Sequence, residues 1–207
     1  MMNYSQYSSR NDEHVMQGCG MPRIKPLEEP YEAEVAERLK KMMPGDNPPL
    51  ALFRTFVRNM PMASAMGPWG GYELGGRLSL PLRDREIVIN RSTARCGCEY
   101  EWGVHVAVFA DAAKLSREQL VSITHGSPKD ACWTDERDRL LIESVDQLHD
   151  NGNIDDVLWA RLANEFTTEQ LLDLPMLTGW YHAISFIANS VGLENESFAP
   201  TFHDFLN

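Results

Sequence analysis

Apolar residues recur at helical spacing in nearly every segment of this 207-residue chain, and no pair of segments alternates as β-strands do. In the segment 134–149, for example, Leu140, Leu141 and Val145 share one face of a backbone that turns once about every 3.6 residues. A half-buried strand would instead repeat every second residue. The pattern therefore predicts an all-α helical bundle.

Start and stop signals set the limits of these helices. Two capping boxes, Ser116 with Gln119 and Thr167 with Gln170, can satisfy the free backbone N–H groups of a helix start. Pro175 lies one turn into the helix after Thr167, and we expect it to kink or briefly interrupt that helix. The helices are expected over 32–43, 50–60, 81 to a break at 94–97, 98–113, 116–125, 134–149, 154–165 (capped by Asn153) and 169–191, with a small-residue, kinked segment in 61–76.

The two ends of the chain differ from the helical body. Residues 1–29 are rich in Ser, Asn, Gln, Gly and Pro and show no apolar period, so we expect an extended or partly disordered arm. A single all-α domain should follow over 30–207. The tail carries Phe198, Phe202 and Phe205, which predicts that it docks on the body rather than moving freely.

The formal net charge of -11 is spread along the chain rather than gathered in one tail. A chain this acidic lacks the basic surface that nucleic acids require, and an anionic membrane would repel it. No apolar run approaches the roughly 18 residues of a membrane span. The first thirty residues also lack the apolar centre of a signal peptide. We therefore expect a cytoplasmic protein with no nucleic-acid or membrane partner.

The stretch 81–115 gathers thiol, carboxylate and imidazole groups more densely than any other part of the chain. Cys96 and Cys98 lie two positions apart, and Glu86 precedes them. Glu101 and His105 follow Cys98 by three and seven positions, which places all three on one face if the segment is helical. Such a stripe has the groups needed to form a thiolate or to move a proton.

The order Glu86, Cys98, Glu101, His105, within the patterns LPxRxRE and CxYEWxxH, resembles the site motif of the carboxymuconolactone decarboxylase family. The superfamily of this family includes alkylhydroperoxidase D. The resemblance covers residues 49–192 and implies an all-α fold with a helical hairpin at its centre. It also implies a homo-oligomer (a dimer, trimer or hexamer), a small-molecule substrate and no cofactor.

The peroxidase branch of that superfamily implies a thiol-dependent, antioxidant function, which is our first hypothesis. There a Cys-x-x-Cys pair reacts with peroxide through its second thiol, but Glu101 stands at that position here. Cys98 would then be the reactive thiol, stabilised as a thiolate at its helix start, and Cys96 would resolve its sulfenic acid. His105, with Glu86 and Glu101, would relay the proton, and an external thiol would be the reductant.

The decarboxylase branch works with Glu and His alone, and it implies a second hypothesis. His105 would be the acid or base in a cofactor-free decarboxylation or isomerisation of a small organic acid or lactone. Glu86 or Glu101 would tune it, while Arg91 or Arg95 could hold a substrate carboxylate. A third hypothesis is a binding protein whose site has lapsed, with the carboxylates in buried ion pairs with arginines and the cysteines as apolar filler.

Other histidines, cysteines and aromatic residues have lesser expected roles. Tyr100, Trp102 and His182 are expected to support the site. Cys19 and Cys132 stand alone and are expected to be structural or incidental thiols. No metal site is expected, because the histidines outside the motif are scattered and none forms the paired spacing typical of zinc ligands.

Overall fold

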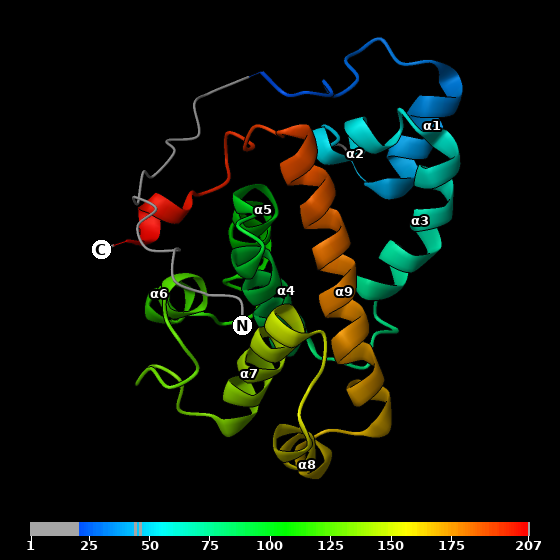
Figure 1. The fold of residues 1–207 in the computed structure, drawn as a ribbon. Coiled ribbons are helices and arrows are strands. Elements are labelled where there is room, and N and C mark those ends of the chain that lie inside the picture. The colour runs from blue at the N-terminus through cyan, green and yellow to red at the C-terminus, as the bar shows by residue number, and fades with distance from the viewer. Residues whose placement is uncertain (1–20, 44, 46, 207) are drawn as a thin grey trace, which may run out of the picture.

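The computed structural model describes residues 21–43, 45 and 47–206. In these residues all regular secondary structure is helical, so the predicted all-α class is confirmed (Figure 1). Cys19 and most of the predicted arm lie outside the described residues. The helices are α1 Ala33–Met42, α2 Ala51–Phe56, α3 Met60–Glu73, α4 Leu82–Arg95, α5 Glu99–Phe109, α6 Arg117–His125, α7 Glu136–Asn151, α8 Asp156–Glu165, α9 Thr168–Val191 and the short 3-10 turn η1 Phe202–Phe205.

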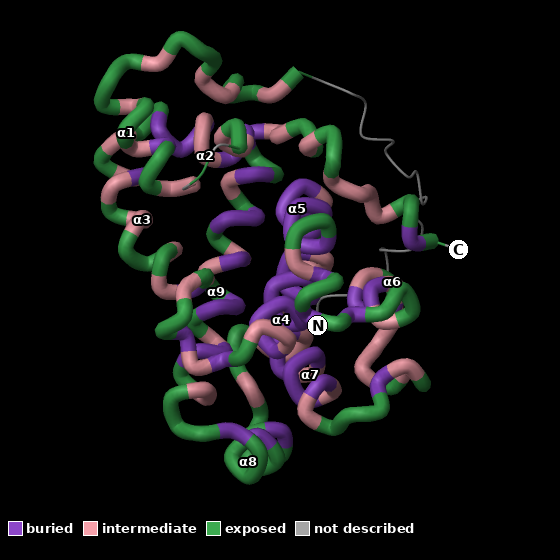
Figure 2. The backbone as a smooth tube through the Cα atoms, turned by 180° about the vertical axis from the view of Figure 1, so that it is seen from behind, coloured by how far each residue is buried: buried purple, intermediate pink, exposed green. Residues whose placement is uncertain are grey.

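Helix α4 is the centre of the molecule and packs against α5, α6, α7 and α9. Its Ile87-Val88-Ile89 run is completely buried, as expected of a helix enclosed by others rather than of a strand. Figure 2 shows the buried colour along most of α4. Glu86, at the start of this run, is therefore held deep in the protein.

Helices α4 and α5 form a hairpin whose turn is made by Cys96, Gly97 and Cys98. Gly97 has φ +60°, a left-handed conformation that a residue without Cβ adopts at little cost. Cys98 is the N-cap residue, and α5 begins at Glu99. The helix ends at Phe109, before the predicted 113, and the chain then turns at Lys114, which has φ 55°.

Helix α9 is the longest and runs between α3 on one side and α4 and α5 on the other (Figure 1). Its capping box at Thr167 and its left-handed Gly192 end are as predicted, and the box at Ser116 is present in α6. Of the two outcomes expected at Pro175, a kink or a brief interruption, the interruption is absent, because α9 continues through this residue. Proline removes only one N–H from a helix that packing holds on both sides.

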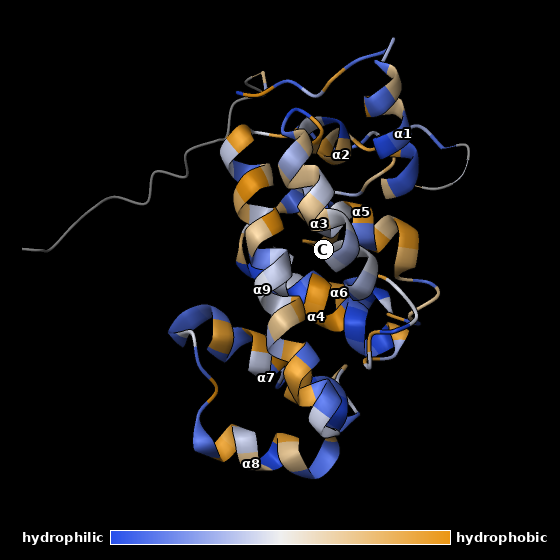
Figure 3. Cartoon of the chain, turned by 90° about the vertical axis from the view of Figure 1, so that its right-hand side faces the viewer, coloured by the Kyte–Doolittle hydropathy of each residue, from blue (hydrophilic) through white to orange (hydrophobic). Residues whose placement is uncertain are grey.

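The start of α8 was predicted incorrectly. Asp155, not Asn153, is its N-cap, and the Asp155 carboxylate accepts a hydrogen bond from the backbone N–H of Leu158 at 2.8 Å. The residues before Asp155 remain outside the helix. Figure 3 shows α8 crossing the end of the molecule opposite α1 and α2.

The described parts of both terminal segments contact the helical body. The backbone N–H of Arg23 donates to Val191 O at 2.7 Å, so the described part of the N-terminal segment lies against the end of α9. In the tail, the rings of Phe202 and Phe205 pack on Trp102 at centroid distances of 5.0 and 5.2 Å. Phe198 is exposed, so the predicted docking is right for two of the three aromatic residues. No helix in the described part of the chain has the length and apolar character that crossing a bilayer requires.

Candidate active site

Glu86 of α4 and His105 of α5 meet inside the helical hairpin. The Glu86 Oε2 atom lies 2.8 Å from His105 Nδ1, and both side chains are buried. A carboxylate can only accept here, so Nδ1 carries the hydrogen and Nε2 keeps its lone pair. The pair therefore fixes both the orientation and the tautomer of the imidazole.

Two further acidic or phenolic groups face the other nitrogen of the ring. The Tyr181 hydroxyl, from α9, is 3.0 Å from His105 Nε2, and Glu101 Oε2 is 4.0 Å from the same atom. Burial raises the pKa of Glu101, while the nearby His105 acts in the opposite direction. Burial also raises the pKa of Tyr181 well above its ordinary value, with Glu101 and Glu86 adding to the effect. Tyr181 is thus a phenol that donates to Nε2, and the neutral form of Glu101 is favoured.

Arg85 closes the cluster from the side of Glu86. Its Nε donates to Glu86 Oε1 at 2.9 Å and its Nη1 donates to Leu74 O at 3.0 Å. The guanidinium lies 5.2 Å from the centre of the Phe109 ring, which itself packs 5.3 Å from the His105 ring. Arg85 balances the buried carboxylate charge, while Phe109 covers the imidazole.

The arginines expected at the site are engaged elsewhere. Arg91 forms a bidentate pair with Asp146, at 2.7 and 2.8 Å, and Arg95 pairs with Asp150. Arg83 likewise pairs with an aspartate of α7 at 2.7 Å. The expectation that Arg91 or Arg95 holds a substrate carboxylate is therefore wrong, because both guanidinium groups already form ion pairs with aspartates of α7.

The two cysteines of the hairpin turn are free thiols in different surroundings. Cys98 is fully buried, and burial raises its pKa to about 12, although the Glu101 backbone N–H and the Ser185 hydroxyl act against this rise. Cys96 is half-buried, and burial raises its pKa as well, against the effects of Ser185 and Arg95. The expected Cys98 thiolate is thus disfavoured, because the loss of solvation on burial raises the thiol pKa more than the N–H groups at the start of α5 lower it.

The residues expected to support the site have other partners. The Tyr100 hydroxyl donates to Glu196 at 2.6 Å and accepts from a backbone N–H of α2, which ties α5 to neighbouring segments. Trp102 is core packing against the tail. His182 faces His149, with 2.9 Å between His182 Nε2 and His149 Nδ1, so its neighbour Tyr181 has the supporting role instead.

One more buried carboxyl group, missed from the sequence, lies near this cluster. Glu73, in the last turn of α3, accepts a hydrogen bond from Trp69 Nε1 at 2.6 Å through Oε1. Its Oε2 atom has no hydrogen-bond partner among the described residues. Burial raises the pKa of Glu73, and its charge also acts on Tyr181. No spacing in the sequence links Glu73 to the motif, whereas Arg85 lies inside the LPxRxRE pattern and could have been found.

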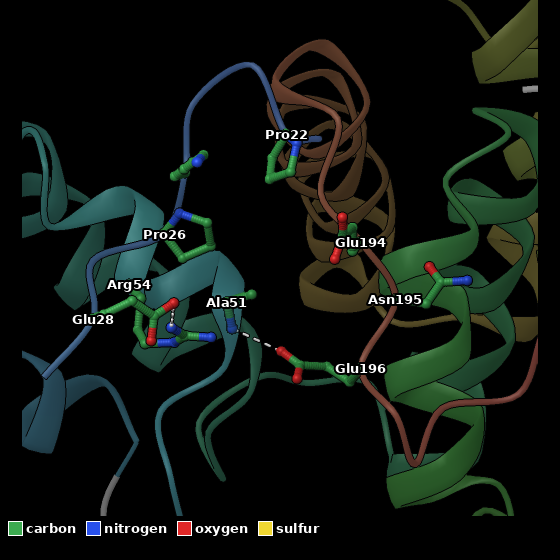
Figure 4. A pocket seen from close by; sticks show the side chains of 9 residues that line it. Pro22, Pro26, Glu28, Ala51, Arg54, Glu194, Asn195 and Glu196 are labelled. Atoms are coloured by element: carbon green, nitrogen blue, oxygen red, sulfur yellow. Dashed lines mark hydrogen bonds and ion pairs between the residues drawn. The ribbon is translucent and has the colours of Figure 1, made fainter. Parts of the chain in front are cut away.

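The surface hollow in Figure 4 is separate from this cluster. It lies between the N-terminal segment, the start of α2 and the segment after α9, and has a volume of about 260 Å³. Three of its charged groups have partners, since Arg54 pairs with Glu28 at 2.7 Å and Glu196 accepts from the Ala51 N–H at 2.7 Å. None of the Glu86, His105 or Tyr181 side chains lines it.

Fold and cluster together define an all-α protein with a buried carboxylate–imidazole–phenol centre. Comparison with solved structures finds an uncharacterized peroxidase-related protein from Silicibacter sp. TM1040, with a TM-score of 0.74 and 13% identity over 89% of this chain and 100% of that one. The debrominase Bmp8 has a TM-score of 0.67 and 13% identity over 88% of this chain and 95% of that one. A variant of Bmp8 with one cysteine replaced by alanine, in complex with 2,3,4-tribromopyrrole, gives 0.65 and 12% over the same shares. No protein-family model matches the sequence, and no curated protein matches it.

The chain therefore has the alkylhydroperoxidase D-like fold that the motif predicted. Sequence identities of 12–13% support a shared fold but do not show that the reaction is shared. The chemistry has to be argued from the residues of this chain.

Proposed function

We propose that the protein catalyses proton transfer on a small organic acid or lactone without a cofactor, as a decarboxylase or isomerase. The arrangement around His105 carries this proposal. Glu86 accepts a hydrogen bond from His105 Nδ1 at 2.8 Å, and His105 Nε2 faces Tyr181 and Glu101. A carboxylate behind an imidazole holds the ring in the tautomer of a base and stabilises the imidazolium that forms.

Each group has a distinct part in the proposed reaction. In an isomerisation, Nε2 of His105 takes the proton from a carbon next to a carbonyl, and the electron pair moves onto the carbonyl oxygen. Glu101 or Tyr181, both favoured in their protonated forms, donates a hydrogen bond to that oxygen. The His105 proton then returns to a carbon. In a decarboxylation, CO₂ leaves, its bonding pair stays on carbon, and a protonated His105 supplies the proton.

The test is deuterium exchange in D₂O, followed by proton NMR for a panel of small carboxylated lactones and keto acids. Exchange reports proton abstraction even without net turnover. We expect exchange that His105→Gln abolishes and that the matched variant Cys98→Ser retains. Absence of exchange across the panel, or exchange unchanged in His105→Gln, would contradict the proposal.

Thiol-dependent reduction of hydroperoxides is the second candidate, because Cys96 and Cys98 lie on either side of Gly97 and the Ser185 hydroxyl acts on both sulfurs. The structural relatives also include a peroxidase-related protein and a debrominase studied with one cysteine replaced. The Cys98 thiol would be oxidised to a sulfenic acid as the peroxide O–O bond breaks and an alcohol leaves. Cys96 would then form a disulfide with release of water, and an external dithiol would reduce it. Hydroperoxide consumption that needs a dithiol and disappears in Cys98→Ser would establish this route.

We also propose that the protein is a homo-oligomer. Three large apolar side chains of α9, Leu172, Met176 and Phe186, are 64%, 46% and 61% exposed. Their spacing places them along one side of this helix. Contiguous exposed apolar surface of this kind is typical of subunit interfaces.

A further inference from the structure

Three side chains outside the acid–base cluster converge from distant parts of the chain. Cys96 is the C-cap residue that follows α4, His149 lies in the last turns of α7 and His182 lies in the middle of α9. The Cys96 Sγ atom and one ring nitrogen from each histidine all lie within 4.8 Å of one another. All three residues are half-buried, so an ion from solvent can reach them. Sequence spacing could not reveal the cluster, because its members lie far apart in the chain.

Hydrogen bonding already sets the tautomer of one ring. His182 Nδ1 lies 2.8 Å from the backbone carbonyl of Thr178, one turn earlier in α9. A carbonyl only accepts, so His182 Nδ1 carries the hydrogen and the lone pair is on Nε2. That lone pair accepts a hydrogen bond from His149 Nδ1 at 2.9 Å, and a metal ion bound by both nitrogens would replace this hydrogen. Metal-binding histidines commonly donate their other N–H to a backbone carbonyl in this way.

We propose that Cys96, His149 and His182 bind one Zn²⁺ ion. A thiolate with two neutral imidazoles is a ligand set that suits zinc, with bonds of about 2.3 Å to sulfur and about 2.0–2.1 Å to nitrogen. Two nitrogens on a tetrahedral ion with such bonds are about 3.4 Å apart. The observed distance of 2.9 Å between His149 Nδ1 and His182 Nε2 therefore has to increase by only a few tenths of an ångström. Three protein ligands leave the fourth position of the tetrahedron open to water or a substrate.

The charges around the cluster are compatible with a cation. The groups that act on His149 are Arg95 and His182 on one side and Asp150 and Asp146 on the other. Arg95 is paired with both aspartates, so its positive charge is compensated.

This site shares no side chain with the proposed proton-transfer cluster, but it uses a thiol that the redox route needs. Tyr181 and His182 are consecutive in α9, yet one ring contacts His105 and the other contacts His149. A zinc ion would bind neither Glu86 nor His105. It would, however, occupy the Cys96 sulfur that the redox candidate needs for its disulfide.

The experiment uses the full chain, reduced and freed of metal with a chelator, then titrated with ZnCl₂ by calorimetry. We expect one Zn²⁺ per chain. Removing a partner that only supports a ligand commonly costs about 10- to 100-fold in affinity, so Cys96→Ala or His149→Ala should weaken binding by more than about 100-fold. Cys132→Ala and His125→Ala are the matched controls, since both residues lie outside the cluster, and they should bind as the wild type does.

A second readout needs no variant. One equivalent of Zn²⁺ should protect Cys96 from iodoacetamide while Cys132 still reacts, as mapped by peptide mass spectrometry. Replacing Zn²⁺ with Co²⁺ should give the absorption of a cobalt–thiolate bond. Absence of stoichiometric binding by the wild type, equal binding by the Cys96 and His149 variants, or alkylation of Cys96 at the same rate with and without Zn²⁺ would each overturn the proposal.

Discussion

Glu86 and His105 are 19 residues apart in the sequence, and their side chains meet at 2.8 Å between Oε2 and Nδ1. The turn between α4 and α5 brings them together, and Arg85 balances the carboxylate charge from the adjacent position. Both side chains are buried, so water cannot replace the hydrogen bond that each makes to the other. Replacing either one leaves a buried polar group without its partner.

Glu86→Gln should destabilise the protein even though it preserves the shape of the side chain. The amide can still accept from His105, but its NH₂ group then faces Arg85, whose buried charge loses its counterion. We expect a loss of about 1–3 kcal/mol in the free energy of unfolding, measured by urea denaturation. Glu34→Gln, on the exposed side of α1, is the control and should unfold with the wild type. Equal midpoints for all three proteins would refute this role for the pair.

Glu101 should make stability fall as pH rises. Its pKa is raised above the ordinary 4.5 by burial, so between 4.5 and the raised value the folded state binds more protons than the unfolded state. The free energy of unfolding therefore decreases with increasing pH across that window. Glu101→Gln has no carboxyl proton to lose. The melting temperature of this variant minus that of the wild type should therefore increase as pH rises from 4 to 8. A difference in melting temperature between variant and wild type that is the same at every pH would count against a raised Glu101 pKa.

Cys98 should resist alkylation in the folded protein. With a pKa of about 12, roughly one in ten thousand of its thiols is ionised at pH 8, and the side chain is enclosed as well. Cys132 is partly exposed and should react with iodoacetamide before Cys98 does. Peptide mass spectrometry at timed intervals gives the order, and urea should abolish the difference. Rapid modification of Cys98 without denaturant would favour the thiol route instead.

Phe109 should control access to His105. Its ring packs 5.3 Å from the imidazole and is itself partly exposed, so it lies between the site and solvent. Phe109→Ala is expected to increase the rate at which diethylpyrocarbonate modifies His105, because the cover is removed. Val108→Ala, at the neighbouring exposed position, is the control and should leave the rate unchanged. The same His105 rate in all three proteins would mean that solvent arrives by another path.

The apolar side of α9 should mediate self-association. Light scattering coupled to gel filtration is expected to give a multiple of the 23.5 kDa chain for the wild type. A variant with both L172E and M176E places two charges in the interface and should shift the mass toward one chain. V157E, at an exposed apolar residue of α8, should not change the mass. A wild-type mass of 23.5 kDa would rule the assembly out.

Local patterns predicted the fold well because they reflect local physics. The capping boxes at Ser116 and Thr167 involve residues three apart, and the buried Ile87-Val88-Ile89 run has no polar face to expose. The Glu86–His105 pair followed from a family motif with fixed spacing. These features need little knowledge of which helices become neighbours.

The remaining site features depend on tertiary packing. Tyr181 reaches His105 from 76 positions away, and the His149–His182 contact spans 33 positions, so neither leaves a periodic signal. The sequence placed Cys98 correctly at a helix start but could not show that α9 encloses it, with Ser185 acting on its sulfur. Enclosure by a distant helix reversed the expected chemistry of this thiol.

Helix α9 presents Tyr181 to one cluster and His182, the next residue, to another. A single backbone turn therefore belongs to both sites, and any shift of that turn moves both rings together. Ligands at the two sites should then alter each other's affinity, and thermodynamic linkage requires the same factor in both directions. Zinc affinities measured with and without a bound carbon acid, beside acid affinities measured with and without zinc, would reveal this reciprocity or show that the helix keeps the two sites energetically separate.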